Sequence, residues 1–162
     1  MLCYKSDISM KKDLRFLKDH ISETVIETKL CEIDEVFQSD DCFDDVPNYP
    51  GIYILVARRT KFQYPKGPSN GLSPILYIGT SNHLKTRLKQ HLKLYKEAKE
   101  DFKKCTKWMY GRYNSIVAFG ADLYYLRVTG CEKEKALESK AIEGFYDTYG
   151  ALPVGNGANS YR

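Results

Sequence analysis

The stretch Gly51-Ile-Tyr-Ile-Leu-Val-Ala57 and the stretch Ile75-Leu-Tyr-Ile-Gly79 decide the fold. Both are rich in β-branched and aromatic residues and are bounded by proline or glycine, which predicts two strands. Residues 58–74 between them are punctuated by prolines and glycines and carry several basic residues. We therefore predict a β-hairpin with an unusually long, basic loop over about residues 58–74.

Helix signals follow the hairpin. Ser81 or Asn82 is a candidate N-cap, and apolar residues recur at helical spacing up to residue 102. Residues 121–129 predict a third strand, and residues 132–149 predict a second long helix that is acidic in its first turn. The order β-β-α-β-α predicts an α+β fold, with a small three-stranded antiparallel sheet flanked by helices.

The remaining segments suggest additions to this framework. Residues 1–46 predict an acidic N-terminal arm that is helical or extended, with a short amphipathic helix over residues 9–22. Residues 47–162 form the predicted main domain, which has a second inserted loop at about residues 105–119. Aromatic and basic residues interleave in that second loop, which suits either stacking on nucleic acid or packing against the helix.

The charge is distributed unevenly along the chain. The net charge is +4, but residues 1–50 carry 6 Lys/Arg against 12 Asp/Glu, a net of −6. Residues 51–162 carry 19 Lys/Arg against 9 Asp/Glu, a net of +10. A body this basic suits a polyanion such as DNA, because Lys and Arg release counterions when they meet phosphates. A solubilising surface charge is the alternative.

Composition also bears on the compartment. Five cysteines form no CxxC pair and no Cys/His cluster with zinc spacing, and an odd number cannot all pair internally. No window approaches the roughly 18 apolar residues that a membrane span needs. We therefore expect a cytoplasmic protein with free thiols and no membrane association.

Charged residues fall on apolar helix faces. Glu138 shares a helix face with Ile142 and Phe145, and Arg87 lies one turn before His91 on the other helix. A carboxylate on an apolar stripe is costly unless it is paired, protonated or bound to a cation. Two interpretations remain open: a buried structural network, or a phosphate site in which Arg clamps the phosphate and Glu holds a divalent ion.

These elements, taken in order, resemble the GIY-YIG nuclease family. The matching sequences are GIYIL, LYIGTSNHLKTRLKQHL, ALESKAI and LPVGN, within residues 47–156, about two thirds of the chain. One such tripeptide would be a weak signal, whereas five elements in order on suitable secondary structure are specific. The resemblance is to stand-alone members of the restriction-endonuclease type.

The resemblance implies a catalytic site. Tyr53 and Tyr77 would stand side by side near the attacking water, and Arg87 would hold and polarise the scissile phosphate. Glu138 would ligate one Mg²⁺ or Mn²⁺ ion per active site, with no small-molecule cofactor. Phosphodiester hydrolysis would proceed by in-line attack of water without a covalent intermediate, whereas direct attack by a phenolate is the alternative.

The family pattern is less uniform at three other positions. His91 lies where the resemblance places a tyrosine or histidine, and its imidazole would accept the Tyr53 proton. Asn156 would position phosphate or neighbouring side chains, with Asn159 as the alternative equivalent. Thr80 stands where repair-type relatives commonly carry lysine, which disfavours an excision-repair role.

DNA contacts are predicted from basic side chains, with a solvated loop as the alternative for the hairpin insertion. The predicted nucleic-acid-binding residues are Arg58, Arg59, Lys61, Lys66, Lys85, Lys89 and Arg112.

The expected function is a restriction or genome-defence endonuclease that acts on DNA, and a homodimer is the hypothesised assembly. The alternatives are a mobile-element or repair and recombination nuclease, a catalytically silent DNA-binding protein of the same fold, and a regulatory subunit whose acidic arm masks its basic surface.

Overall fold

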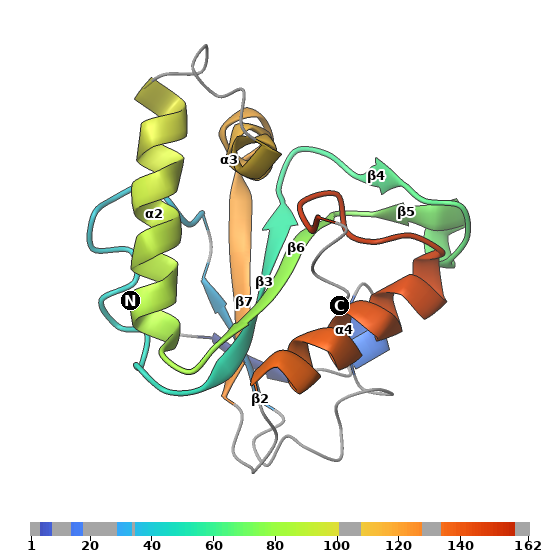
Figure 1. The fold of residues 1–162 in the computed structure, drawn as a ribbon, viewed down its shortest axis with the longest axis horizontal. Helices are drawn as coiled ribbons and strands as arrows, with labels where there is room; N and C mark the ends of the chain where they lie inside the picture. Colours follow the sequence, from blue (N-terminus) through green and yellow to red (C-terminus); the bar gives the residue numbers. More distant parts are fainter. Residues whose placement is uncertain are drawn as a thin grey trace.

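The computed structural model describes residues 4–7, 14–17, 29–33, 35–100, 108–127 and 134–157. Its centre is an antiparallel sheet of five strands in the order β1-β2-β7-β3-β6 (Figure 1). The strands are β1 (Tyr4–Asp7), β2 (Lys29–Ile33), β3 (Gly51–Ala57), β6 (Ile75–Ser81) and β7 (Ala121–Arg127). Helices pack on this sheet, so the fold is α+β, as predicted.

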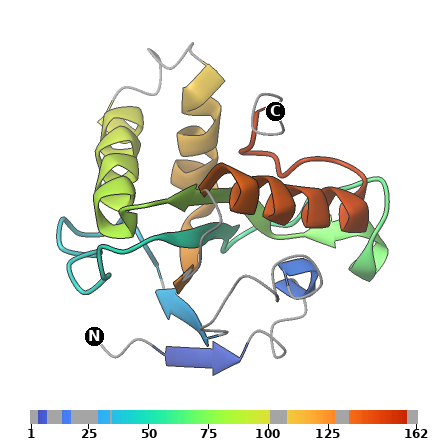
Figure 2. The same cartoon turned by 60° about the horizontal axis from the view of Figure 1, so that its bottom comes forward.

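The three strands predicted from the sequence are confirmed as β3, β6 and β7, but the predicted count of three is wrong. β2 pairs with β7, and β1 pairs with β2, so two strands from the predicted N-terminal arm extend the same sheet (Figure 2). The pairing of β2 with β7 aligns Cys31 with Tyr125, which are far apart in sequence. Of the helix predicted over residues 9–22, residues 14–17 are described and form a helical turn.

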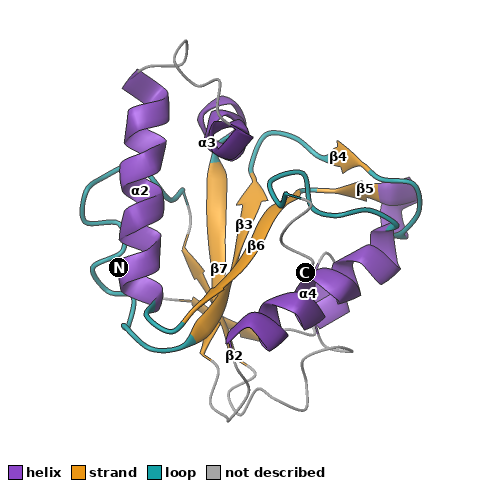
Figure 3. Ribbon diagram, in the orientation of Figure 1, coloured by secondary structure: helices purple, strands orange, loops and turns teal. Residues whose placement is uncertain are grey.

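Three helices are described: α2 (Leu84–Glu100), α3 (Trp108–Phe119) and α4 (Glu134–Tyr149). α2 and α4 are the two predicted helices, whereas α3 corrects the loop predicted over residues 105–119 (Figure 3). Tyr113 and Ile116 lie three residues apart on one face of α3 and are both buried. Burial of this face favours a helix that the local sequence pattern signals only weakly.

Side chains on the two faces of the sheet form two cores. Ile52, Ile54 and Ile78 belong to the core that contains the buried face of α4. Tyr53 and Tyr77 belong to the other core, which contains buried residues of α2 and α3. The alternation along β3 therefore sends Tyr53 towards α2 and its neighbours Ile52 and Ile54 towards α4.

The long hairpin loop contains secondary structure of its own. It forms the short strands β4 (Phe62–Gln63) and β5 (Leu72–Ser73), joined through the 3₁₀ helix η3 (Pro68–Gly71). Tyr64 in this loop is buried, and the backbone N–H of Lys66 donates to the carbonyl of Tyr149 at the end of α4. The predicted insertion is thus packed against the C-terminal end of α4 (Figure 1).

The acidic segment 35–46 is also part of the packed structure. Val36, Phe37, Phe43 and Val46 are buried in the core on the α2 side. Acidic side chains of the same segment face α2, where Asp44 pairs with Lys89 at 2.6 Å and Asp40 pairs with Lys96. No helix among the described residues is long and apolar enough to cross a membrane.

Candidate functional site

Two tyrosines from adjacent strands form the floor of the candidate site. Tyr53 on β3 and Tyr77 on β6 have ring centroids 5.8 Å apart, and both side chains are buried. Gly79 is the residue opposite Tyr53 in the β3–β6 register. A Cβ atom at Gly79 would lie 2.5 Å from the Tyr53 hydroxyl oxygen, so the glycine of the YIG tripeptide makes the space for the Tyr53 phenol.

Helix α2 places two basic side chains against this pair. The Nε2 atom of His91 lies 2.7 Å from the Tyr53 hydroxyl, in a buried hydrogen bond. The Nε atom of Arg87 donates to the same hydroxyl at 3.4 Å, and its Nη1 donates to Gln90 at 3.1 Å. Arg87 and His91 lie one helical turn apart, which is why both reach the same phenol oxygen.

A third tyrosine completes the group, and the sequence did not predict its role. The hydroxyl of Tyr113 on α3 lies 2.7 Å from Nδ1 of His91, and both side chains are buried. His91 therefore bridges two phenols, Tyr53 through Nε2 and Tyr113 through Nδ1. From the sequence, Tyr113 was one of several aromatic residues interpreted as stacking or packing groups, because nothing local indicates that α3 packs beside α2.

Burial and charge set the protonation states of this group. Burial raises the pKa of Tyr53 well above its usual value, and the proximity of Tyr77 adds to the rise while Arg87 opposes it. Burial lowers the pKa of His91 well below its usual value, and the positive charges of Arg87 and Arg112 lower it further. Near neutral pH, His91 is thus a neutral imidazole and Tyr53 a neutral phenol.

Arg112 also belongs to this site, although it was predicted as a DNA contact. Its guanidinium carbon lies 3.5 Å from the centroid of the Tyr77 ring, a cation–π arrangement. Its Nε donates to the carbonyl of Gly155 at 2.8 Å, which ties α3 to the C-terminal segment. Arg112 is half-buried. Its guanidinium holds the Tyr77 ring in place and adds positive charge near His91.

Glu138 lies on α4, whose buried residues belong to a different core from Tyr53 and Tyr77. Its Oε2 accepts a hydrogen bond from the Thr80 hydroxyl at 3.3 Å, next to Gly79 on the outer strand β6. As predicted, it shares a helix face with the buried residues Ile142 and Phe145. Within the described residues no group of three His, Cys, Asp or Glu could hold a metal. One half-buried carboxylate fits a Mg²⁺ ion that keeps water ligands and takes oxygens from substrate phosphate.

Asn156 contacts the backbone of the YIG tripeptide. Its Nδ2 donates to the Ile78 carbonyl at 2.8 Å, and its Oδ1 accepts from the Ile78 N–H at 3.0 Å. The side-chain amide thus satisfies the outward-facing backbone groups of Ile78 on β6, between Tyr77 and Gly79. Asn156 positions the tyrosine strand, whereas its sequence alternative, Asn159, lies outside the described residues.

Comparisons of the chain with protein-family models, with curated proteins and with solved structures give no match.

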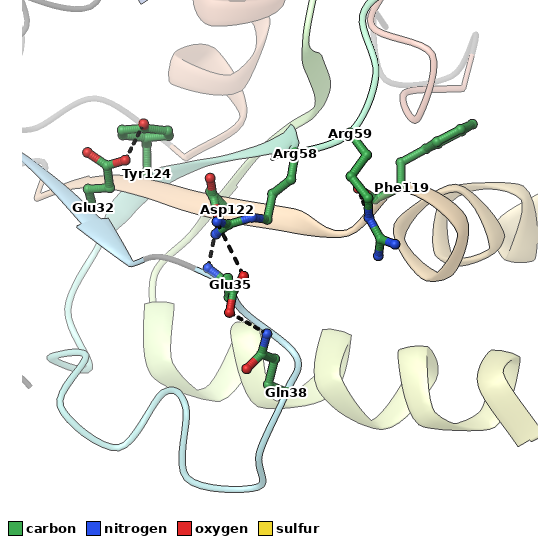
Figure 4. Close-up of polar contacts among 8 residues, drawn as sticks. All are labelled: Glu32, Glu35, Gln38, Arg58, Arg59, Phe119, Asp122 and Tyr124. Atoms are coloured by element: carbon green, nitrogen blue, oxygen red, sulfur yellow. Dashed lines mark hydrogen bonds and ion pairs between the residues drawn. The ribbon is translucent and has the colours of Figure 1, made fainter.

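Two predicted DNA contacts, Arg58 and Arg59, have partners within the protein. Arg58 Nη1 donates to Asp122 at 2.5 Å, and its Nη2 pairs with Glu35 at 3.3 Å (Figure 4). Glu35 also accepts from Gln38 and donates its backbone N–H to Asp122, so the network ties segment 35–46 to β7. Arg59 Nε donates to the carbonyl of Phe119 at 3.4 Å.

The predicted lysine contacts are spread over the surface. Lys61 and Lys66 in the hairpin loop are exposed, and Lys85 on the first turn of α2 is half-buried. Lys89 is exposed and forms the ion pair with Asp44 described above. The structure therefore brings together Tyr53, Tyr77, Arg87, His91 and Arg112. Glu138 of α4 contacts Thr80 of β6, and Asn156 of the C-terminal segment contacts Ile78 of β6. Among the described residues no contact links these four lysines to that cluster.

Proposed function

We propose that this chain is a metal-dependent endonuclease that hydrolyses DNA phosphodiester bonds by attack of an activated water molecule. The proposal rests on one observation: the Tyr53 hydroxyl is within hydrogen-bond distance of both a neutral histidine and an arginine. The basic net charge of residues 51–162 and the resemblance of the motif order to GIY-YIG nucleases point in the same direction.

In the proposed reaction, Tyr53 takes a proton from the attacking water while its own proton passes to Nε2 of His91. The water oxygen forms the new bond to phosphorus, and the bond from phosphorus to the leaving oxygen breaks. A neutral phenol with a raised pKa is a poor base alone, so the histidine acceptor is required. No bond forms between Tyr53 and DNA.

Arg87 has a second task besides contacting Tyr53. Among the described residues, two of its five N–H donors bond to Tyr53 and Gln90. The remaining donors allow the same guanidinium to bind a phosphate. The negative phosphate would also offset the arginine charges that help to hold the pKa of His91 low. Substrate binding would therefore make His91 a better proton acceptor.

Glu138 would hold the metal ion, which would supply stabilisation of the charge that develops on the leaving oxygen. The Thr80 hydroxyl, which donates to the Glu138 carboxylate, orients that carboxylate from β6.

The test is cleavage of supercoiled plasmid by the purified protein with Mg²⁺. We expect Arg87→Ala and Glu138→Gln each to lower the rate by roughly 100-fold or more, because each removes a group that acts on the transition state. Glu143→Gln is the matched control, since Glu143 is an exposed carboxylate on the same helix. Cleavage by Glu138→Gln at the wild-type rate would refute the assigned metal ligand.

One observation favours a second candidate, a DNA-binding protein of the same fold without catalysis. The Tyr53 side chain is 1% exposed, as expected of a purely structural phenol. This candidate predicts that the wild-type protein binds DNA but cleaves none with Mg²⁺ or Mn²⁺.

A further inference from the structure

The hydrogen bond between Nδ1 of His91 and the Tyr113 hydroxyl has no part in the reaction proposed above. In a neutral imidazole, one ring nitrogen donates a hydrogen bond and the other accepts one. Nε2 and Nδ1 of His91 each lie 2.7 Å from a tyrosine hydroxyl, so one of the two phenols must donate to the ring and the other must accept from it.

The contact of Arg87 with Tyr53 favours one of the two arrangements. Arginine can only donate, so the Tyr53 oxygen accepts from Arg87 Nε and retains its own proton for another partner. The Nε2 atom of His91 is the acceptor at 2.7 Å. If Nε2 carried the proton instead, the Tyr53 oxygen would accept from two donors, and its hydroxyl proton would have to turn away from His91 towards Tyr77.

We propose that Tyr113 is the positioning residue of the site: its hydroxyl accepts the Nδ1–H of His91 and so keeps the Nε2 lone pair directed at Tyr53. This inference rests on the proposed function, in which Nε2 receives the Tyr53 proton. In catalytic and metal-binding histidines, the hydrogen-bond partner of the other ring nitrogen fixes the tautomer and the ring orientation in this way. That partner is usually a carboxylate or a backbone carbonyl.

The geometry around Tyr113 suits this task. α3 packs beside α2 (Figure 2). Tyr113 and Ile116 of α3 are buried in the core that also contains residues of α2 and of the sheet. The neutral phenol leaves His91 uncharged at rest, whereas a carboxylate at the same place would favour a permanent imidazolium. Because Arg87 and Arg112 already lie nearby, a neutral partner avoids placing a third resting positive charge in this interior.

The test removes only the hydroxyl, with Tyr113→Phe, which keeps the ring in the core. The control is Tyr95→Phe, since Tyr95 also lies on α2 but stacks on Phe37, whereas the ring of His91 contacts Tyr53, Tyr77 and Tyr113. We expect Tyr113→Phe to lower kcat for plasmid cleavage about 10- to 100-fold, with KM changed less than twofold, as for other histidine-orienting partners. Tyr95→Phe should leave both constants within twofold of wild type.

A second measurement separates this inference from the proposed function. Nitrogen-15 NMR of the imidazole should show the Nδ1–H form of His91 in the wild-type protein and a mixture of both forms in Tyr113→Phe. This readout needs no catalysis, so it remains decisive if the protein does not cleave DNA. An Nε2–H form in the wild type, or an unchanged tautomer and unchanged kcat in Tyr113→Phe, would overturn the inference.

Discussion

His91 is neutral in the folded protein because its imidazole is buried among two phenols and near two arginines. In the unfolded chain the same side chain takes up a proton below about pH 6.5. Between that pH and the lowered pKa of the folded state, the unfolded chain binds more protons. The contribution of His91 to stability is therefore complete above about pH 6.5 and is lost as the pH falls below that value.

The loss of stability with falling pH gives a prediction for His91→Gln. The unfolding free energy of the wild-type protein should decrease between about pH 7 and pH 5, and His91 should account for up to about 1.4 kcal/mol per pH unit. His91→Gln should be less stable at neutral pH and should show a flatter dependence over the same range. Urea denaturation at a series of pH values measures it.

The control for that experiment is His83→Gln, because His83 is exposed at the start of α2. It should retain the wild-type pH dependence. A slope in His91→Gln as steep as that of the wild type would show that other groups cause the loss of stability in acid.

Some residues of the candidate site were predictable from the sequence and others were not. Tyr53, Arg87 and His91 were predicted because helical spacing and motif order are local features of the chain. Tyr113 was not, since its partner lies 22 positions away on another helix and the contact depends on tertiary packing. Arg112 was predicted from its charge as a DNA contact, and charge alone does not reveal the Tyr77 ring beneath it.

At the level of elements, the outer strand β6 depends on a side chain for part of its hydrogen bonding. At Ile78 the side chain of Asn156 makes the two hydrogen bonds that a neighbouring strand would otherwise make. It donates one to the Ile78 carbonyl and accepts one from the Ile78 N–H. We predict that Asn156→Ala and Asn156→Asp each cost about 1–3 kcal/mol of stability, because a backbone group of the buried residue Ile78 loses its partner. Urea denaturation measures this cost, with Lys93→Ala at an exposed position of α2 as the control.

Hydrogen exchange distinguishes the two Asn156 variants. An aspartate still accepts from the Ile78 N–H but can no longer donate to the Ile78 carbonyl. The Ile78 amide should therefore stay protected in Asn156→Asp and exchange faster in Asn156→Ala. Equal exchange in both variants would argue against the bidentate contact.

The elements that the sequence predicted are those with strong local patterns. The strand over residues 51–57 and the helices α2 and α4 carry clear periodicity and capping or termination signals, and Gly150 ends α4 with a positive φ of 79°. α3 was predicted as a loop because Gly111 and a cluster of aromatic residues obscure its pattern. The sequence predicts the segment of β2 only as part of a helical or extended arm, because the pairing of β2 with β7 is a long-range contact.

Across the whole molecule, the acidic and basic halves of the sequence meet along α2. Asp40 and Asp44 pair with lysines of this helix, while the apolar residues of the same segment are buried beneath them. Because these ion pairs are exposed, each contributes only about 0–1 kcal/mol to stability. On the proposed function, their larger effect would be to neutralise basic charge that DNA phosphate would otherwise meet.

We therefore predict that Asp40→Asn combined with Asp44→Asn tightens DNA binding without unfolding the protein. The unfolding free energy should change by less than about 2 kcal/mol, and the plot of log binding constant against log salt should become steeper by up to about 2. Fluorescence anisotropy with a DNA duplex at several salt concentrations measures the slope. The double variant Glu97→Gln with Glu143→Gln changes the net charge equally at exposed positions and should have a smaller effect. Equal effects of the two double variants would assign the change to net charge.

The C-terminal segment has a consequence for self-association. The N–H of Gly155 donates to the carbonyl of Leu76 at 2.7 Å, beside the two bonds between Asn156 and Ile78. These three bonds occupy the backbone groups that an outer strand would otherwise offer to a strand from another molecule. At residues 76–78 the protein is thereby protected from edge-to-edge aggregation, and a second copy cannot add a strand to β6 at these residues.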